Sequence, residues 1–483
     1  MKFKTLSGFV MAVVAMTWCM EAAAVRPVHP SGKVTPQTAI GPRAVQVGGE
    51  RTDLTLFTCQ VGLAPFVCYD PFQLRRAYGV DTFVNAGFGG AGRTIVIIDA
   101  FDSPTLQTDV DTFADRYGLT HASTFLTKVY PDGATPFDPT NANMQGWAGE
   151  ITLDVEWAHA IAPDAKVVLV LAKSNDDADI LSALRYAVDH NLGDVVSMSF
   201  GENESCTDPD LIAGYHDAFV TATQKGITLF ASSGDQGAAQ QTCDGKSWTQ
   251  AVSSPASDPL VSGVGGTELH AADYCLAGLG CNPATHPAAG TYAGEVAWNE
   301  FDSVSTGGGF SVLFDAPPFQ RSALTSSGRA VPDVAYNAAI YHGVLVVFQG
   351  HTFLFGGTSA GAPQWAGITA IADQVAGKRL GYLNAAFYQV RQTPPNYGAS
   401  FHDVTAGNNA VVEEDADGNV VPVAGFAAGS AWDATTGIGS PKADSLISRL
   451  IRFTSPGDAV AAIATSKPHG HAKPVAPSRM EPH

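Results

Sequence analysis

The sequence has little positive charge for its length. It contains 27 Lys and Arg residues among 483, against 46 Asp and Glu, so the formal net charge is −19. Proteins that bind nucleic acid cluster Lys and Arg on one surface to neutralise phosphates. We therefore expect no nucleic-acid partner. The excess of carboxylates suits an acidic medium, in which many of them are protonated.

Long apolar runs are also scarce. The run over residues 6–18 is shorter than the roughly 20 residues that a transmembrane helix needs. It follows Lys2 and Lys4 and precedes three alanines at 22–24, an order typical of a secretory signal peptide. We predict that residues 1–24 are removed and that the chain is secreted, into the medium or a periplasm, with no further membrane contact. A membrane anchor is the alternative interpretation.

Cysteine pairs with C-x-x-C spacing are absent, which disfavours a structural zinc site. One of the seven cysteines, Cys19, leaves with the signal peptide. An even number then remains in a secreted chain, which indicates disulfides. Proximity along the chain favours one of about fifteen possible sets of pairs: Cys59–Cys68, Cys206–Cys243 and Cys275–Cys281.

Four apolar, β-branched runs alternate with helical patterns along the chain. The runs cover residues 93–101, 165–172, 194–201 and 226–234. This alternation predicts βαβ units and an α/β fold with a central parallel sheet. Active-site residues of proteins with such sheets lie at the C-terminal ends of the strands. Two of these ends carry the stretches SMSFG and ASSGDQG.

Composition divides the chain into a linker, a domain and a tail. Residues 25–68 are polar and weakly periodic, so we expect a short linker. Residues 69–454 have the apolar patterns of one domain, in which the DADGN run at 415–419 predicts a hairpin turn. Residues 455–483 are rich in Pro, Ala and His with few large apolar side chains, so we expect a disordered tail.

A candidate nucleophile, Ser359, stands among glycines and small residues in the stretch GGTSAGAP, residues 356–363. A serine hydroxyl needs an adjacent base to become a nucleophile, and the usual base is histidine. None of the thirteen histidines opens a helix in a His-Gly-Thr context. We interpret five of them as surface or hydrogen-bonded residues: His159, His190, His270, His342 and His351.

Two carboxylates offer a different base. Glu150 and Asp154 lie one turn apart on a predicted helix over residues 150–162 and are therefore neighbours. Adjacent buried carboxyls cannot both ionise easily, so one pKa rises. Such a pair can accept a proton from a serine hydroxyl in acid. A helix turned to expose both groups is the alternative.

Helical spacing of about 100° per residue distinguishes two sides of this helix. Glu150 and Asp154 continue the inward stripe of Trp157 and Ile161. The opposite, solvent-facing arc carries Thr152, Glu156 and His159. Glu156 is therefore expected to be an ordinary exposed carboxylate.

A third carboxylate, Asp235, lies in the stretch SSGDQG directly after a predicted buried strand. Aspartate in such a loop often serves only to form the turn. The functional alternative is a carboxylic acid that stays protonated and donates a hydrogen bond to an oxyanion. A donor of that kind is worth about 3–4 kcal/mol in a transition state.

Together these stretches resemble the sedolisin family, the serine-carboxyl peptidases with a subtilisin-like, three-layer fold around a central parallel sheet. GGTSAGAP resembles the nucleophile motif of that family, GEITLDVE its Glu/Asp helix and SSGDQG its oxyanion-hole motif. The resemblance covers about residues 69–454, and the ordered combination of motifs is specific.

The resemblance implies a monomeric peptidase that hydrolyses polypeptides in acid through an acyl-enzyme. Ser359 would be the nucleophile, Glu150 the general base and Asp154 the residue that orients the base. Asp235 would stabilise the oxyanion beside the Ser359 backbone N–H. The strand edge SMSFG would pair with the substrate backbone. A non-catalytic binding protein on the same fold and a His-dependent hydrolase are the alternatives.

Two residues depart from the patterns of related peptidases. Phe200 replaces the Trp that the family usually has between this Ser and Gly, which bears on its extended hydrogen-bond network and not on the core chemistry. Asp99 stands where subtilisins with a histidine base keep their triad Asp. Since no partner histidine is found, we interpret Asp99 as a structural residue at the end of a strand.

The resemblance also implies one structural calcium ion, because FHDVTAGNN and AAGSAWDATTGIGSP resemble the two halves of the family's site. The implied ligands are the carboxylates of Asp403 and Asp433 and the backbone carbonyls of Val404, Gly429 and Ala431. Such oxygen ligands are the type that calcium prefers. Ala431 stands where the family tends to have Gly, which a carbonyl ligand tolerates if φ is negative.

Overall fold

The computed structural model describes residues 37–38, 45–48, 56–321, 324 and 327–469. The predicted signal peptide, residues 1–24, lies outside this range. Within the described part of the chain, no helix has both the length and the apolar character that crossing a membrane requires.

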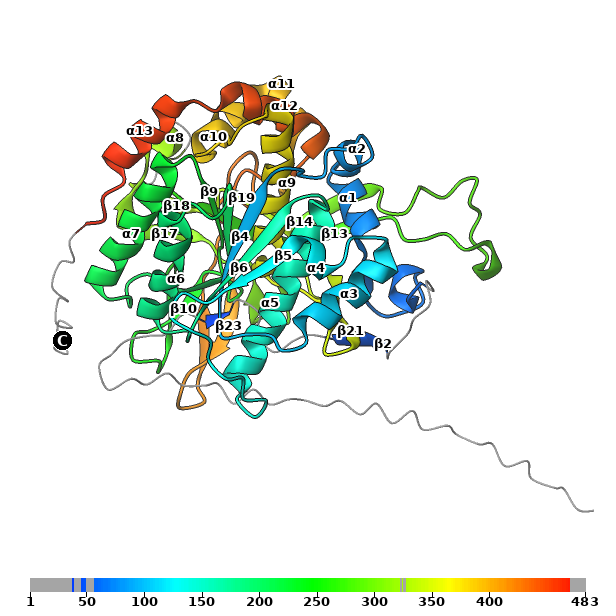
Figure 1. Cartoon of the computed structure of the whole chain (residues 1–483), viewed down its shortest axis with the longest axis horizontal. Helices are drawn as coiled ribbons and strands as arrows, with labels where there is room; N and C mark the ends of the chain where they lie inside the picture. Colours follow the sequence, from blue (N-terminus) through cyan, green and yellow to red (C-terminus); the bar gives the residue numbers. More distant parts are fainter. Residues whose placement is uncertain (1–36, 39–44, 49–55, 322–323, 325–326, 470–483) are drawn as a thin grey trace, which may run out of the picture.

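A central sheet runs through the molecule (Figure 1), with strand order β14-β13-β9-β7-β4-β6-β5 and β19 also paired to β13. Four strands match the predicted runs: β4 Thr94–Ala100, β6 Lys166–Ala172, β7 Val195–Met198 and β9 Thr228–Ser232. The others are β5 Leu126–Val129, β13 Ser262–Ala271, β14 Tyr292–Ala297 and β19 Val334–Asn337. The pairings are parallel except that of β13 with β14, so the predicted α/β fold is confirmed.

Helices cover both faces of this sheet (Figure 1). One face carries α6 Asp177–Asp189 and α7 Pro209–Gln224. The other carries α5 Ala142–Ile161 and α9 Gly361–Ala376, with α3 Leu106–Tyr117 packed outside α5. Strand side chains alternate between the two apolar layers, because successive residues of a strand point to opposite faces. The predicted three-layer, subtilisin-like arrangement is confirmed.

The helix that carries Glu150 begins earlier than predicted. The Asn141 side chain accepts hydrogen bonds from the backbone N–H groups of Asn143 and Met144, which caps the helix at Ala142 instead of near residue 150. The helix ends at Ile161, one residue before the predicted end at Ala162.

The predicted solvent-facing arc of α5 is wrong. Thr152, Glu156 and His159 are each at most 1% exposed. The Glu156 carboxylate accepts a hydrogen bond from the backbone N–H of Val347 at 3.0 Å. A hairpin and α3 therefore cover the side of α5 that turns away from the sheet, and the spacing along one helix cannot reveal such a second layer.

The segment predicted to be a linker contributes strands to the domain. β2 Val45–Gly48 pairs with β21 His351–Phe355, and β3 Val67–Tyr69 pairs with β20 His342–Phe348. Backbone hydrogen bonds to the β20–β21 hairpin hold these residues in place. The composition of residues 25–68 gave no sign of this pairing, because backbone groups form it.

The tail prediction is wrong for its first part. α13 Pro456–Thr465 is capped by Ser455, whose hydroxyl accepts a hydrogen bond from the Gly457 backbone N–H. The helix packs on α7, with Ala462 and Ser466 buried. Small alanine side chains allow close helix packing, so few large apolar residues are needed.

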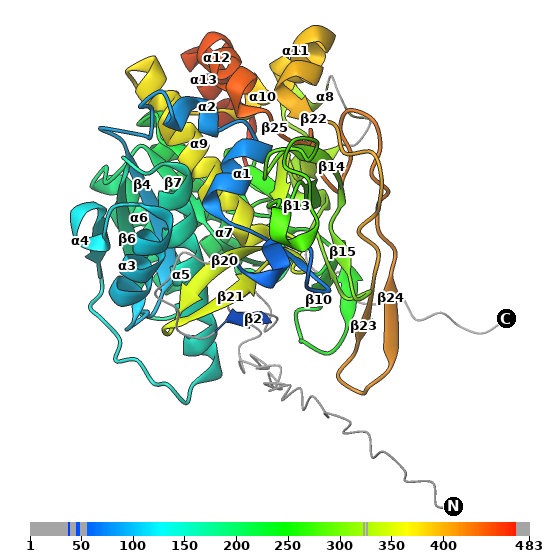
Figure 2. The same ribbon diagram turned by 90° about the vertical axis from the view of Figure 1, so that its right-hand side faces the viewer.

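All three predicted disulfides are present in the structure: Cys59–Cys68, Cys206–Cys243 and Cys275–Cys281. Each closes a loop of 37 residues or fewer, which is why proximity along the chain was a sufficient guide. The DADGN run also forms the predicted turn, between β23 Val411–Glu414 and β24 Val420–Val423. This hairpin lies along the side of the molecule, near β15 Asn299–Glu300 (Figure 2).

Candidate active site

The residues predicted to carry the chemistry meet at the carboxyl edge of the central sheet. Ser199 directly follows β7, and Asp235 follows β9. Ser359 lies in the 3-10 turn η3 Thr358–Ala360, which leads into α9. α5 packs against that turn and supplies Glu150.

Glu150 and Ser359 are neighbours in the interior. Both side chains are fully buried. Neither the Ser359 hydroxyl nor the Glu150 carboxyl has a partner at hydrogen-bonding distance and angle. Burial raises the pKa of Glu150 well above its usual range, the nearby carboxyls of Asp154 and Asp99 raise it further, and the Ser359 hydroxyl opposes the shift. A carboxylate made this basic can take a proton from serine.

Asp154 connects this base to the turn of the nucleophile. The Ser199 hydroxyl donates a hydrogen bond to Asp154 Oδ1 at 2.9 Å and lies 3.4 Å from the Ser359 backbone carbonyl. Burial raises the pKa of Asp154 well above its usual range, while the bond from Ser199 opposes the shift. Ser199 therefore connects Asp154 to the turn that carries Ser359.

Asp99 belongs to the same buried group of acids. It is fully buried on β4, and neither of its carboxyl oxygens has a hydrogen-bond partner. Burial raises the pKa of Asp99 well above its usual range, and the charge of Asp154 adds to the shift. The interpretation of Asp99 as only a strand-end residue is thus too narrow, because α5 brings a second acid against it.

Asp235 is held by the residue that precedes the nucleophile. Asp235 Oδ1 accepts hydrogen bonds from the backbone N–H and the hydroxyl of Thr358, each at 2.8 Å. Burial raises the pKa of Asp235 to about 7, although both bonds from Thr358 oppose the shift. Oδ2 faces Gly357, where a Cβ would lie only 2.6 Å away. A proton on Oδ2 would therefore lie at the turn that carries Ser359.

The described histidines lie elsewhere. His159 Nε2 lies 3.0 Å from the Thr120 carbonyl, and burial lowers the pKa of His159 to about 4. His190 Nδ1 lies 2.9 Å from the Tyr186 carbonyl. No described histidine forms a hydrogen bond with the Ser359 hydroxyl.

The predicted substrate edge lies on β8 Phe200–Asn203, next to Ser199. In the structure, β1 Gln37–Thr38 pairs antiparallel with this edge, with Gln37 opposite Gly201. The other edge of β8 is taken by a short strand over residues 253–254. In the structure both edges of β8 are thus paired with other segments of this chain.

Phe200 contributes packing at the position where the family usually has Trp. It is 1% exposed, and its ring centroid lies 6.2 Å from that of Trp147. A phenyl ring has no N–H to donate, so position 200 adds no side-chain hydrogen bond to the group of acids.

The implied calcium ligands come together around one loop. Asp403 accepts a hydrogen bond from the Ala431 backbone N–H, and Asp433 accepts one from Gly429, each at 3.0 Å. The Thr436 hydroxyl lies 3.2 Å from Asp433 and 3.5 Å from the Val404 carbonyl. Burial raises the pKa of Asp433, an effect that a bound cation would offset. Carboxylate and carbonyl oxygens such as those of Asp403, Asp433 and Val404 are of the kind that calcium takes as ligands.

The condition of a negative φ at Ala431 is not met, because φ there is +73°. The left-handed region is unfavourable for residues with a Cβ and is the reason for glycine at such positions. The carbonyl of Ala431 accepts a hydrogen bond from the Tyr397 hydroxyl at 2.9 Å, which holds this conformation.

Known proteins resemble this chain in sequence. A sequence profile of the subtilase family matches residues 141–393. Kumamolisin from Bacillus sp. (strain MN-32) is 35% identical over 401 residues, which cover 80% of this chain and 64% of the relative. The chain belongs to the subtilase family, in its sedolisin group. Sedolisin from Pseudomonas sp. (strain 101) is 31% identical over 353 residues, which cover 70% of this chain and 54% of the relative.

A solved structure supports the same assignment. Pseudomonas sedolisin, a serine-carboxyl proteinase complexed with two molecules of pseudo-iodotyrostatin, aligns with a TM-score of 0.65 and 26% identity. The alignment covers 80% of this sedolisin-family chain and 98% of that one. The chain spans only 64% and 54% of the length of the two curated relatives above.

Sequence reasoning did not assign roles to Ser199 and Thr358. Both stand next to residues that were predicted, Ser199 in SMSFG and Thr358 directly before Ser359. Their positions offered a signal, since a hydroxyl beside a buried acid can hold it by a hydrogen bond. Which acid each one holds depends on how β7, β9 and α5 pack.

Proposed function

We propose that this sedolisin-family domain is a secreted serine-carboxyl peptidase that hydrolyses polypeptides in acid. The observation that carries the proposal is the buried Glu150 beside Ser359, with Asp154 behind it and no hydrogen bond from a described histidine to the serine. All four predicted catalytic side chains are present, which disfavours a non-catalytic binding protein on this fold.

In the proposed reaction, Ser359 Oγ attacks the scissile carbonyl carbon while its proton passes to Glu150. The carbonyl oxygen becomes an oxyanion, which accepts hydrogen bonds from protonated Asp235 and from the Ser359 backbone N–H. Collapse of this intermediate breaks the C–N bond, and Glu150 returns the proton to the leaving amine. Water then attacks the acyl-enzyme by the same path and releases the carboxylic acid.

Acid suits this reaction for two reasons. Asp235 can donate a hydrogen bond only while it holds its proton, and its pKa is about 7. The buried carboxyls of Asp99, Glu150 and Asp154 repel one another when ionised, so few negative charges can occupy the group at once. One charge shared by Glu150 and Asp154 is enough for the proton transfer.

The proposal includes a substrate mode, a calcium ion and a compartment. An extended peptide would pair with the β8 edge in the place that β1 takes in the structure. The loop of Asp403 and Asp433 would hold one calcium ion, which stabilises that loop and takes no part in the reaction. The three disulfides accord with secretion into an oxidising compartment.

The decisive experiment compares three variants on denatured protein at about pH 4, with the product peptides identified. Ser359→Ala should abolish hydrolysis, and Glu150→Gln should abolish it nearly as completely because the base is lost. Glu156→Gln is the matched control, since Glu156 is equally buried on α5 but bonds to Val347. Full activity of Glu150→Gln would refute the carboxylate mechanism.

A further inference from the structure

Two histidines and a carboxylate meet outside the active site. Glu268 and His270 are two residues apart on β13 and therefore point to the same face, and His342 begins β20. The two imidazole rings meet edge to face with centroids 4.8 Å apart. Atoms that could ligate a metal, one from each of the three residues, all lie within 4.8 Å of one another.

We propose that Glu268, His270 and His342 bind a divalent transition-metal ion, with zinc as the best fit. Two imidazoles and one carboxylate are a ligand set that zinc uses when it keeps a fourth position open. With bonds of about 2.0–2.1 Å, a tetrahedral ion places neighbouring ligand atoms about 3.4 Å apart. Glu268 Oε1 lies 3.4 Å from His270 Nε2 and 3.7 Å from His342 Nδ1. Glu268 and His270 thus already have the required spacing, and the His342 ring lies beside them.

The backbone under this site is held in place without an ion. Buried Asn337 accepts a hydrogen bond from the Leu269 backbone N–H at 3.0 Å and donates one to the His342 carbonyl at 2.7 Å. One side chain therefore connects the two segments that carry the ligands. This preorganisation lowers the entropic cost of assembling the site when the ion binds.

His342 has an orienting contact of its own. Its Nδ1 lies 2.9 Å from the Leu269 carbonyl. A backbone carbonyl that holds one ring N–H is a common partner of a metal-bound histidine, and it leaves Nε2 for the ion. If the ion takes Nδ1 instead, the contact with Leu269 is exchanged for the metal bond.

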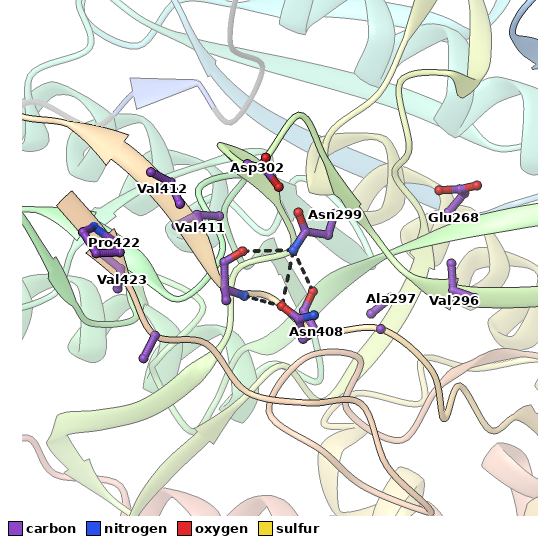
Figure 3. Close-up of a pocket in the computed structure, with 13 residues that line it drawn as sticks. Glu268, Val296, Ala297, Asn299, Asp302, Asn408, Val411, Val412, Pro422 and Val423 are labelled. Atoms are coloured by element: carbon purple, nitrogen blue, oxygen red, sulfur yellow. Dashed lines mark hydrogen bonds between the residues drawn. The ribbon is translucent and has the colours of Figure 1, made fainter. Parts of the chain in front are cut away.

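The site is open on one side. Glu268 lies at one end of a groove of about 900 Å³ that extends to the β23–β24 hairpin (Figure 3). Across the β13–β14 ladder, His270 faces Gly294, where a Cβ would meet no atom within 4 Å. The His270 side chain is 47% exposed. Water or a small ligand can therefore reach the fourth position of the ion.

This proposal does not depend on peptidase activity, and the site differs from the calcium loop in its nitrogen donors. The test uses the full Ser359→Ala chain at pH 7.5, stripped of transition metals and kept in excess calcium. Cobalt(II) chloride is titrated while its visible absorption is recorded, and zinc chloride is titrated by calorimetry. We expect one saturable ion per chain with the intense bands of four-coordinate cobalt.

Single substitutions locate the ion. His270→Ala, His342→Ala and Glu268→Gln should each weaken binding by more than the roughly 10–100-fold cost of losing an outer-shell partner. His121→Ala is the matched control, because His121 is exposed and contacts one carboxylate at 2.8 Å but no second histidine. Circular dichroism of each variant should be unchanged.

Two outcomes would overturn the proposal. One is that the Ser359→Ala chain, with the three ligands intact, shows no saturable binding of cobalt or zinc. The other is undiminished binding in the double variant His270→Ala/His342→Ala, which would place the ion on other groups, such as the histidines of the C-terminal tail. A variant that binds weakly but has lost its circular dichroism spectrum is replaced by Glu268→Gln, the substitution closest in shape.

Discussion

Thr358 donates two hydrogen bonds to one oxygen of Asp235, from its backbone N–H and from its hydroxyl, each 2.8 Å long. The acid is thereby attached to the residue directly before the nucleophile. Because one oxygen of Asp235 is occupied as an acceptor, the other can hold the proton. The same contact thus fixes the position of the proposed oxyanion donor, while burial keeps its pKa raised.

The first prediction concerns the alkaline limit of activity. The pKa of Asp235 is raised to about 7, so kcat/KM should fall as the pH rises through about 7 and the donor loses its proton. Asp235→Ala should lower kcat/KM by about 10²–10³-fold. Asp235→Asn keeps a neutral N–H donor, so it should retain more activity and lose the decline near pH 7. The measurement is a pH profile of kcat/KM.

The control for this profile is Asp373→Asn. Burial raises the pKa of Asp373 to about 7 as well, but its carboxylate accepts the Leu380 backbone N–H at 2.8 Å, near the far end of α9. This variant should keep the alkaline limb of the parent. If kcat/KM of Asp235→Asn still declined near pH 7 as in the parent, another group would be responsible for that decline.

The second prediction concerns Gly357. Its φ is +112°, and a Cβ would lie 2.6 Å from Asp235 Oδ2. Gly357→Ala should displace the donor and lower kcat by about 100-fold, the effect expected of a shift of about 1 Å in a reacting group. Gly377→Ala is the control, since its φ is +67° but a Cβ there meets no atom. It should cost stability and leave kcat unchanged.

The third prediction concerns the calcium loop. Because Ala431 has φ +73°, Ala431→Gly should stabilise the protein by about 0.5–1 kcal/mol, after the larger entropy of glycine in the unfolded chain is subtracted. Ala428→Gly, in the same loop without a positive φ, should destabilise it instead. Thermal unfolding measures both effects.

A chelator should lower the Tm of the parent and of Ala431→Gly alike, because the proposed ligand at 431 is a backbone carbonyl that both chains have. Addition of calcium should restore each Tm. An unchanged Tm after chelation would refute the calcium site and leave the expected effect of Ala431→Gly in place.

The fourth prediction concerns stability against pH. Burial raises the pKa of Glu202 well above its usual range, and Asp177 raises it further. The folded protein therefore holds a proton that the unfolded chain releases above about pH 4.3, so this stability is present in acid and is lost as the pH rises. Glu202→Gln should show a smaller fall in Tm between pH 5 and pH 8 than the parent. Exposed Glu414→Gln should behave like the parent.

Two histidines, the buried His159 and the half-buried His402, change stability in the opposite direction. Burial lowers the pKa of His159 to about 4 and that of His402 to about 3. They cost stability as the pH falls below about 6.5, where the unfolded chain takes up their protons. The Tm should therefore be highest in moderate acid. A Tm that rises steadily from pH 5 to pH 8 would contradict the dominance of the buried carboxyls.

Much of the fold followed from local patterns. The four apolar runs became β4, β6, β7 and β9, because a strand buried on both faces must be apolar throughout. The disulfides followed from proximity along the chain. The helical tail residues 456–465 and the paired strands before residue 69 were missed, since packing and backbone pairing with distant elements hold them.

The candidate site, like the fold, was predictable from the sequence only in part. By itself the sequence determined that Glu150 and Asp154 share one side of a helix, because helical geometry depends only on neighbours along the chain. Only the tertiary structure decided that Glu156 is equally buried, that Asp99 joins the acids, and that Thr358 holds Asp235. The reason is physical: the pKa of a carboxyl depends on desolvation and nearby charge, and elements far apart in the sequence supply both.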